Sequence, residues 1–422
     1  MNVLLLTTVY PPEVRSAALL MAELAESLAR RGHRVTVITG PQQGSTPIVP
    51  RVDERGGVRV IRVPTLPVHR LRLPAVVRGL GQILNSVTYL VTAAAVSRPD
   101  VTLAYSPPLT LGIVGAALHR LKRTPHALNV QDLVPQYAID LGVLKNATLI
   151  RVLKWIEKEV YRNVQLITVH SPGNADYLIR QGVPPAKVTV VPNWVDTDAV
   201  RPAPRSTTFR KKNGLEQKFV VLFAGALGFA QDLDTVVEAG ALLRGHPQIV
   251  LLIVGEGVEK ERLQRKARAF GLENVRFMPA VANADYPEVV ASADLCLATL
   301  QASLRCPVVP SKLLGYMAAG RPIVASFPEG GDAPRLIREA GCGVCVPPGD
   351  PAQLARAILE ASEDPDECRA RGERGRRYVE ANHDRGRVVA LYEVLFHRLA
   401  GSAAMRPEVG DFPAKARGKD AA

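Results

Sequence analysis

Short apolar runs alternate with segments of helical spacing in both halves of the chain. Residues 3–9 and 35–39 are apolar, and residues 19–31 between them repeat apolar side chains at helical spacing before Gly32. Residues 219–224 and 249–254 repeat the apolar runs later in the chain. Buried parallel strands joined by helices have this pattern. With 422 residues, enough for two domains of about 200 each, the sequence predicts an α/β fold of two Rossmann-like, doubly wound domains.

We divide the chain into two domains, a linker, a helix and a tail. We predict a first domain over residues 1–196 and a second over 215–380. Residues 197–214 are predicted to be the linker, because they hold two prolines and the basic cluster Arg210, Lys211 and Lys212. Residues 381–400 are predicted to form a helix, and residues 401–422 a disordered basic tail.

The positive charge is concentrated in the first half. The net charge is +13, and residues 1–200 hold 22 Lys and Arg against 13 Asp and Glu. Such a surface suits an anionic partner: lipid headgroups, a pyrophosphate-linked acceptor or nucleic acid. Aromatic residues make up only 5% of the chain, which argues against base stacking. We therefore expect no nucleic-acid partner.

Two features bear on location. The chain has five cysteines and no signal peptide, which indicates a reducing cytosol, and Cys342 and Cys345 are interpreted as structural. Residues 79–97 carry no charge, a length that reaches the transmembrane threshold. We interpret them as a helix packed on the first domain, with a membrane span as the alternative. Four arginines precede or enter this run and are predicted to meet a membrane surface: Arg62, Arg70, Arg72 and Arg78.

The segment 308–326 predicts a helix with an anion at its start. Pro310 and Ser311 are typical of a helix N-terminus, and Gly320 with Pro322 ends the helix. Lys312 falls in the first turn, where a cation is unfavourable against the helix dipole. A bound phosphate would compensate it, because helix N-termini offer unpaired N–H groups. A solvated lysine is the alternative.

Polar residues follow the predicted strands of the first domain. Ligands of doubly wound sheets bind at the carboxyl ends of the strands. In the loop after the first strand, Arg15 could grip an acceptor phosphate or be a solvated arginine. Asp132 could be a polar group near an acceptor or cap the following segment. His170 is interpreted as structural, as is His33. The candidate acceptor-binding residues are Glu13, Arg15, Ser16, Ser106 and Asn129.

The second domain carries glycines at two strand ends. Gly225 and Gly228 follow residues 219–224, and Gln231-Asp232-Leu233 is predicted to begin the next helix. Gly255-Glu256-Gly257 follows residues 249–254. Glycine allows the backbone to approach a phosphate or a base closely. We therefore expect a nucleotide site here.

The segment Pro310-Ser311-Lys312, with Tyr-Met-Ala-Ala-Gly-Arg-Pro at 316–322, resembles the donor-binding segment of family 4 glycosyltransferases, which have the GT-B fold. It is most similar to the bacterial branch of colanic-acid fucosyltransferases and fucosamine transferases. Most of the family has two glutamates where this chain has Pro307 and Gly315. The resemblance extends over residues 2–400, including the loops after the strands.

The resemblance implies a glycosyltransferase that moves a sugar from a nucleotide-diphosphate sugar to a lipid-linked saccharide in surface polysaccharide assembly, with retention of configuration. It also implies that the last helix crosses back to the first domain. We assign catalytic roles to Asp132 and Lys312. The expected donor-binding residues are Gly225, Gly228, Gln231, Gly255, Glu256, Gly257, Ser311 and Lys312.

No cofactor is expected, because the sequence contains no Asp-x-Asp motif and no His/Asp cluster for a metal. The expected location is the cytoplasm, peripheral at the inner face of the cell membrane. Two alternatives remain: a non-catalytic GT-B-like protein that binds a nucleotide sugar or acts as a scaffold, and a sugar-nucleotide epimerase.

Overall fold

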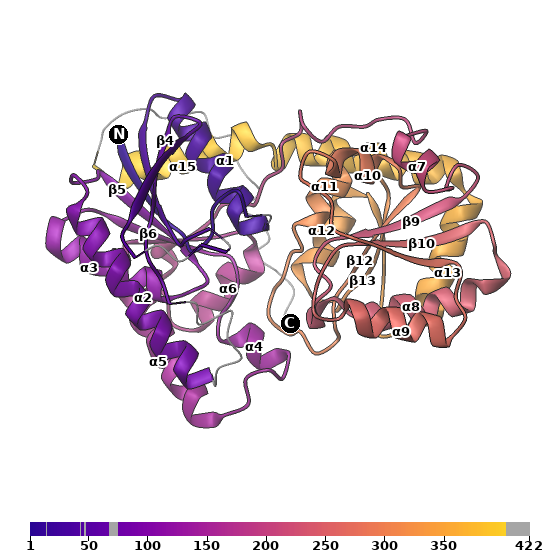
Figure 1. Cartoon of the computed structure of the whole chain (residues 1–422), viewed down its shortest axis with the longest axis horizontal. Helices are drawn as coiled ribbons and strands as arrows, with labels where there is room; N and C mark the ends of the chain where they lie inside the picture. Colours follow the sequence, from indigo (N-terminus) through magenta and orange to yellow (C-terminus); the bar gives the residue numbers. More distant parts are fainter. Residues whose placement is uncertain (14, 43, 46–47, 67–74, 402–422) are drawn as a thin grey trace, which may run out of the picture.

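The computed structural model describes the chain except for residues 14, 43, 46–47, 67–74 and 402–422. The described residues form two α/β domains that lie side by side (Figure 1). Each domain is built on one sheet, of eight strands in the first and six in the second. The predicted fold class, two doubly wound domains, is confirmed.

The first sheet has the order β3-β4-β2-β1-β5-β6-β7-β8, and only the β3–β4 pairing is antiparallel. Its strands are β1 (Asn2–Leu6), β2 (Arg34–Thr39), β3 (Arg51–Arg55), β4 (Val58–Arg62), β5 (Val101–Ser106), β6 (His126–Val130), β7 (Leu166–Val169) and β8 (Val188–Val190). The helices are α1 (Ser16–Arg30), α2 (Ala75–Ala95), α3 (Thr110–Lys122), α4 (Gln136–Asp140), α5 (Ala147–Arg162) and α6 (Pro172–Arg180).

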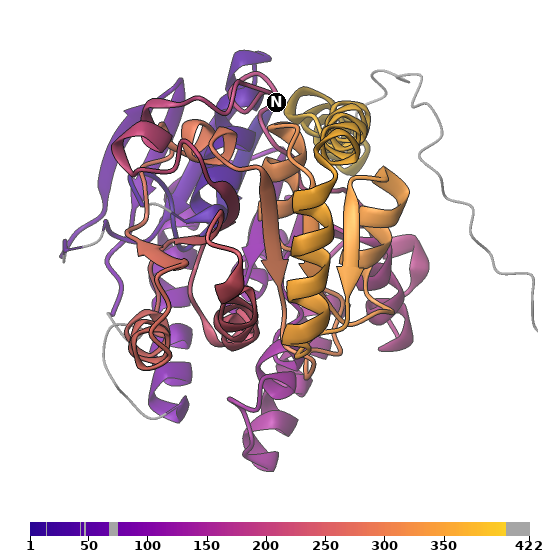
Figure 2. The same ribbon diagram turned by 90° about the vertical axis from the view of Figure 1, so that its right-hand side faces the viewer.

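The second sheet is parallel throughout, in the order β11-β10-β9-β12-β13-β14. Its strands are β9 (Phe219–Ala224), β10 (Ile249–Val254), β11 (Val275–Met278), β12 (Leu295–Thr299), β13 (Ile323–Ser326) and β14 (Gly343–Val346). The helices are α8 (Leu233–Leu242), α9 (Lys260–Ala269), α10 (Tyr286–Ala291), α11 (Lys312–Ala318), α12 (Asp332–Ala340) and α13 (Pro351–Glu363). Helix α13 lies against β13 and β14 (Figure 2).

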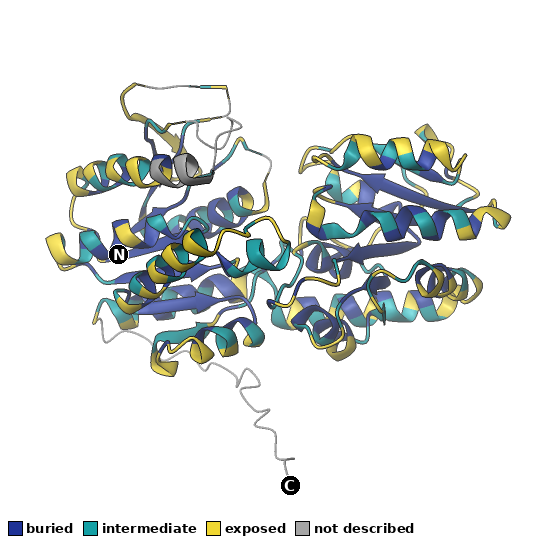
Figure 3. Ribbon diagram, turned by 90° about the horizontal axis from the view of Figure 1, so that it is seen from below, coloured by how far each residue is buried: buried dark blue, intermediate teal, exposed yellow. Residues whose placement is uncertain are grey.

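Burial explains why the central strands are continuous apolar runs. Every residue of β5, β6, β10 and β12 is buried, because helices cover both faces of each sheet (Figure 3). The outer faces of the helices are exposed. The edge strand β3 is exposed along its whole length and carries charges of both signs, which suits an unpaired sheet edge.

Two long helices, α14 (Pro365–Asn382) and α15 (Arg385–Leu399), follow the last strand. Helix α14 packs on α11 and α12 of the second domain. Helix α15 packs on α1 of the first, and its Val388, Tyr392 and Phe396 belong to that domain's core (Figure 1). At its surface His33 Nε2 lies 2.8 Å from Glu393 Oε1.

The segment predicted as the linker, residues 197–214, contains the helix α7 (Thr208–Lys212). Arg210 of this helix is buried. Arg210 Nη2 lies 3.1 Å from Asp294 Oδ2 of the second domain. A buried ion pair holds this end of the segment on the second domain.

The uncharged run 79–97 lies within and just after α2, which packs on α3 and β2. No helix in the described ranges combines the length and the apolar character needed to cross a bilayer. Of the four arginines predicted to meet a membrane, Arg62 is buried at the end of β4, which corrects that prediction for this residue. Arg70 and Arg72 lie outside the described residues, as does the predicted disordered tail from residue 402 onward.

Candidate functional site

The two glycine-containing loops of the second domain pack directly against each other. Gly225 follows β9, Gly255 follows β10, and both have positive φ. A Cβ at Gly255 would lie 1.9 Å from the Gly225 carbonyl oxygen, and a Cβ at Gly257 would lie 2.2 Å from the Leu227 carbonyl oxygen. These glycines are therefore required for contact between the loops, a role that the spacing alone did not predict. Gly228 has open space around its Cβ position.

Lys312 projects from α11 to these loops. Its Nζ donates to Gln231 Oε1 at 2.7 Å and lies 3.4 Å from the centroid of the Phe223 ring. A Cβ at Gly225 would lie 3.3 Å from this Nζ. Within the described chain, no carboxylate lies within ion-pair distance of the amine. Burial lowers its pKa well below the usual range.

Two helix starts lie at this site. Helix α8 starts at Leu233, within the predicted segment Gln231-Asp232-Leu233, and Gln231 itself ends the short 3₁₀ turn Phe229–Gln231. Ser311 does precede α11, but its side chain makes no capping hydrogen bond. The reason is its αR backbone (φ −58°, ψ −25°), because an N-cap side chain normally reaches the next turn from an extended backbone.

Glu256 lies at the rim of the glycine loops. Its side chain is 59% exposed and pairs with Lys260 at 2.6 Å. The backbone carbonyl of Glu256 accepts from Leu227 N at 2.8 Å, so the residue also joins the two loops. Contact of its carboxylate with a base or ribose stays a prediction.

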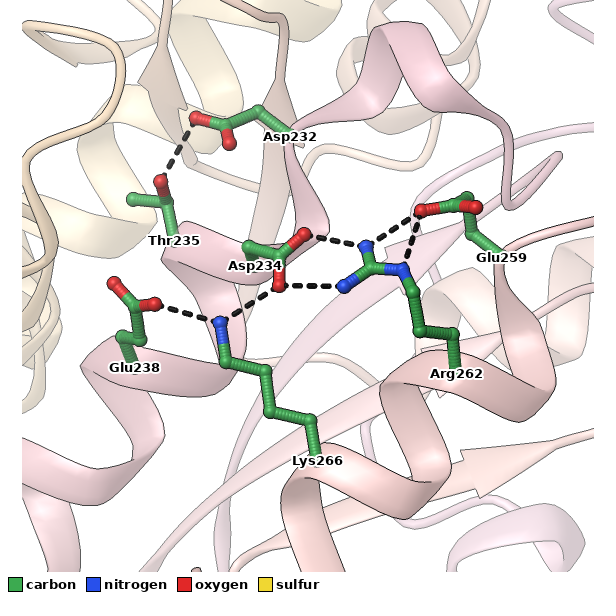
Figure 4. A network of polar contacts seen from close by, with 7 residues as sticks. All are labelled: Asp232, Asp234, Thr235, Glu238, Glu259, Arg262 and Lys266. Carbon is green, nitrogen blue, oxygen red and sulfur yellow. Dashed lines mark hydrogen bonds and ion pairs between the residues drawn. The ribbon is translucent and has the colours of Figure 1, made fainter.

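A charged network braces the helices that follow the loops. Arg262 of α9 pairs with Asp234 of α8 and with Glu259, and Lys266 pairs with Asp234 and Glu238 (Figure 4). Hydrogen bonds from Arg262 lower the pKa of Asp234 to about 2. Because Glu259 N also donates to the Leu227 carbonyl at 3.1 Å, the network helps to hold the loop before α9.

The first-domain loop after β1 reaches the second domain. Ser16, the first residue of α1, donates from Oγ to Ser311 Oγ at 3.3 Å. This contact places the predicted acceptor loop beside the predicted donor segment. Arg15 is exposed and pairs with Glu13 at 3.7 Å. The sequence motifs did not predict the contact, because neither serine carries a local signal for it.

Ser106 and Asn129 are buried rather than open to a ligand. The Asn129 amide donates to the hydroxyl of Tyr392 on α15, and its Oδ1 accepts from Gln131 Nε2 at 2.8 Å. Asn129 therefore fastens α15 to the first sheet, and its position corrects the expectation that it faces an acceptor. Ser106 Oγ is buried without a hydrogen-bond partner among the described residues.

Asp132 lies beyond the carboxyl end of β6. Its side chain reaches solvent, yet the surrounding protein raises the pKa of its carboxyl by burial. Burial, and next the charge of Asp132, raise the pKa of Tyr105 and of Tyr137. A carboxyl that is both accessible and partly desolvated can accept a proton nearer neutral pH than a free aspartate can. The structure shows no contact between Asp132 and Lys312.

Sequence reasoning missed a second bridge between the domains. Gly173 N of α6 donates to Asp332 Oδ1 of α12 at 3.2 Å, and Asp332 also pairs with Arg335 at 2.6 Å. His170 beside it is buried, and this burial lowers its pKa to about 4. His170 is therefore a neutral packing residue, in keeping with its structural interpretation.

Comparison with known families matches both halves of the chain. The family model described as glycosyl transferase 4-like domain matches residues 17–194, and the model described as glycosyl transferases group 1 matches residues 205–378. The chain is a glycosyltransferase. One model lies on the first domain of the enzyme and the other on the second.

Relatives of similar length support this assignment. The glycosyltransferase is 27% identical over 376 residues to the putative colanic acid biosynthesis glycosyl transferase WcaI of Escherichia coli, covering 86% of this chain and 92% of that protein. It is 28% identical over 335 residues to the probable glycosyltransferase WbjE of Pseudomonas aeruginosa, covering 78% and 81%.

Solved structures share the fold. A sucrose-phosphate synthase from Thermosynechococcus elongatus superposes with a TM-score of 0.79 at 20% identity, covering 95% of this chain and 99% of that one. HepE from Anabaena, solved in complex with UDP-glucose, superposes with a TM-score of 0.72 at 21% identity, covering 94% and 99%. The superpositions show that the glycosyltransferase shares the GT-B fold of these proteins. At identities this low they show the fold alone.

We expect Gly173→Ala to reduce the activity of the glycosyltransferase without unfolding it. The added Cβ would lie 2.4 Å from Asp332 Oδ2, so the carboxylate must shift and its contact across the domains is disturbed. A displacement of about 1 Å between reacting groups lowers rates by up to about 100-fold. Steady-state kinetics on any active donor and acceptor pair measures the effect.

The matched control is Gly245→Ala, because a Cβ at Gly245 has no neighbour within 4 Å. We expect it to keep wild-type kcat/KM and the wild-type melting temperature. Equal activity of the Gly173 and Gly245 variants would show that the Gly173–Asp332 contact does not govern domain approach.

Proposed function

We propose that this glycosyltransferase moves a sugar from a nucleotide-diphosphate sugar to a hydroxyl of a lipid-linked saccharide, in the assembly of a surface polysaccharide. The observation that carries the proposal is Lys312: a partly buried lysine without an acidic partner in the described chain, between the two glycine loops and the segment that contacts the first domain.

Lys312 is suited to stabilise the leaving diphosphate. An unpaired ammonium is unfavourable in a buried site, and a phosphate group would supply the missing charge. Preorganised donors near developing negative charge contribute strongly to catalysis. We propose that this cation serves in place of a metal ion. Gln231 Oε1, 2.7 Å from Nζ, orients the amine toward the loops.

We propose that Asp132 acts on the acceptor side of the reaction. Its raised pKa favours a role as the group that receives the proton from the acceptor hydroxyl. Ser16 and Arg15 lie where the first domain meets the second, and Ser16 Oγ donates to Ser311 Oγ. Transfer with retention of configuration is part of the proposal and is supported by the family resemblance alone.

The comparisons support the choice of donor and product. WcaI is named for colanic acid biosynthesis, and HepE was solved with UDP-glucose. We propose a nucleotide-diphosphate sugar on this ground, and a place in the branch of colanic-acid fucosyltransferases and fucosamine transferases on the Pro310-Ser311-Lys312 segment.

Thermal unfolding with a nucleotide panel tests the donor proposal. UDP, GDP and their common sugar conjugates are added without metal and again with Mg²⁺. A ligand at about 100 times its Kd stabilises the folded state by about 2.7 kcal/mol. We expect one base to raise the melting temperature in the absence of metal. No shift with any nucleotide contradicts the proposed donor class, and a shift only with Mg²⁺ contradicts the metal-free mechanism.

We further propose that the enzyme lies on the inner face of the cell membrane through the first domain. Helices α2, α3 and α5 are neighbours and expose apolar and basic side chains together. Helices α2 and α3 contain no acidic residue. We call this the basic–apolar face; its exposed members are Ile83, Leu84, Val87, Val91, Ile113, Arg120, Leu121, Arg123, Arg151, Val152, Trp155 and Lys158.

This composition fits an anionic lipid surface. Apolar side chains can enter the headgroup region while Lys and Arg contact lipid phosphates. Trp155 is 64% exposed, and tryptophan prefers the membrane–water interface. A lipid-linked acceptor would then meet the enzyme at the membrane.

We expect Trp155→Ser to weaken binding to vesicles that contain anionic phosphatidylglycerol by about tenfold or more, because burying a large apolar side chain contributes about 1.5–3 kcal/mol. Co-sedimentation measures binding. Phe270→Ser is the control, since Phe270 is an exposed aromatic residue of the second domain. Equal binding of the Trp155 variant and the wild type would rule out this face as the membrane contact.

A further inference from the structure

A cavity of about 350 Å³ lies behind the donor segment, where the chain passes between the domains. Pro202 of the connecting segment forms one wall, and α14 forms another. Four of the lining residues are arginines and one is an acid: Arg321, Arg369, Arg376, Arg377 and Glu373. We call this cavity the hinge pocket. Its volume falls in the range of small-ligand sites.

Two of these arginines already hold the connection between the domains. Arg376 donates to the carbonyls of Val200 at 2.8 Å, Thr197 at 2.9 Å and Ala318 at 2.7 Å. Arg321 donates to the carbonyls of Ala203 at 2.6 Å and Ala291 at 2.7 Å. One wall of the hinge pocket is therefore a network of guanidinium groups that join the connecting segment to the second domain.

The positive charge of the hinge pocket is incompletely balanced. Arg321 Nε is buried without a hydrogen-bond acceptor in the described chain. Arg369 and Arg377 are exposed; Arg369 has an exposed pairing with Asp366 at 3.1 Å, and no ion pair of Arg377 is found among the described residues. An exposed ion pair contributes little and is readily exchanged for another anion. A concave surface lined by arginines concentrates anions.

We propose that the hinge pocket binds a small phosphorylated metabolite, at a site separate from the donor site. Arginine suits this ligand because its planar fork of donors matches phosphate oxygens. Arg369 and Arg377 would contact the phosphate, while the other two arginines supply positive potential from behind. The ligand would join α14 to the Pro202 wall of the connecting segment.

The position of the hinge pocket links it to the donor site. Helix α11 begins at Lys312 and ends beside Ala319 and Gly320, which line the pocket. A ligand that binds both α14 and the connecting segment would restrain the segment that joins the two domains. Anion binding at the hinge pocket is therefore expected to change turnover without competing with the nucleotide.

Isothermal titration with inorganic pyrophosphate at low ionic strength tests the proposal. Because pyrophosphate resembles the diphosphate of the proposed donor, the titrations use Lys312→Ala protein, in which the donor site is weakened. In this background we expect one binding site, and an affinity at least tenfold lower when Arg369→Gln and Arg377→Gln are added. The control pair is Arg265→Gln and Arg356→Gln, both exposed arginines elsewhere on the second domain.

Loss of affinity with the hinge pair, and not with the control pair, supports the site. Equal affinity in both double variants, or no pyrophosphate binding in the Lys312→Ala background, overturns it. Nucleotide binding by the wild type is measured separately, so failure of the hinge pocket and failure of the proposed donor site give different results. Slower amide exchange in residues 197–205 with pyrophosphate would show that the connecting segment is restrained.

Discussion

Lys312→Ala should lower kcat/KM by about 100- to 1,000-fold, the effect of removing one preorganised donor from a developing anion. The same variant should be as stable as the wild type or more stable in the absence of ligand. The physical reason is that burying an ammonium without an acidic partner is unfavourable, and the alanine removes it. Initial-rate kinetics and a melting curve on one preparation measure both effects.

Lys218→Ala provides the matched control. Lys218 precedes β9, at the opposite end of the strand from Gly225, and its Nζ donates to the Pro247 carbonyl at 2.9 Å. We expect wild-type turnover from this variant. If Lys312→Ala retained wild-type turnover and nucleotide affinity, Lys312 would not carry the leaving group.

The lowered pKa of Lys312 has a consequence for ligand binding. A bound diphosphate would raise this pKa again, so binding should take up protons and affinity should fall as pH rises through the pKa of the free protein. Without ligand, the Lys312 amine binds its proton more tightly in the unfolded chain than in the folded protein. Stability from this group therefore rises with pH up to the ordinary lysine pKa of about 10.4. Titration calorimetry in buffers of different ionisation enthalpy measures the uptake.

Asp294→Ala should cause the largest loss of stability. Asp294 is only 7% exposed, contacts Arg205 and Arg210 of the connecting segment, and accepts from Val220 N at 2.8 Å. Removing one partner of a buried ion pair costs about 3–5 kcal/mol, because the other charge stays buried. For a domain of this size we expect the melting temperature of the second domain to fall by about 10 °C.

Asp234→Ala tests whether burial is the reason for the large loss of stability expected from Asp294→Ala. Asp234 also contacts two cations, Arg262 and Lys266, but on the surface network of Figure 4. Exposed pairs contribute about 0–1 kcal/mol, so its melting temperature should fall by no more than about 4 °C. Similar losses for the two variants would show that burial is not what makes Asp294 important.

Much of the fold could be predicted because it depends on local patterns. Strands β9 and β10 begin and end at the residues that their apolar runs predicted, 219–224 and 249–254. Parallel strands covered on both faces must be apolar throughout, and few elements other than such strands require short runs of this kind. The structure of the connecting segment was harder to predict, because the burial of Arg210 depends on Asp294, an acid 84 positions further along the sequence.

The candidate site also has residues that local patterns predict and residues whose role depends on packing. Gly225, Gly255 and Lys312 were recognisable because glycines at strand ends and a lysine at a helix start are local signals. Asn129 was assigned to the acceptor on the same reasoning, yet it is buried against Tyr392 of α15. A strand end predicts where a side chain lies, but not whether another helix covers it.

The sequence by itself determined the two doubly wound domains, their central strands and the positions of the glycine loops, since these depend on hydrophobic period and backbone freedom over a few residues. Only the tertiary structure decided that Ser16 meets Ser311, that Asp332 receives the Gly173 amide and that four arginines surround one cavity. These contacts join residues far apart in the chain, and their formation depends on how whole domains and terminal helices pack, which no local pattern encodes.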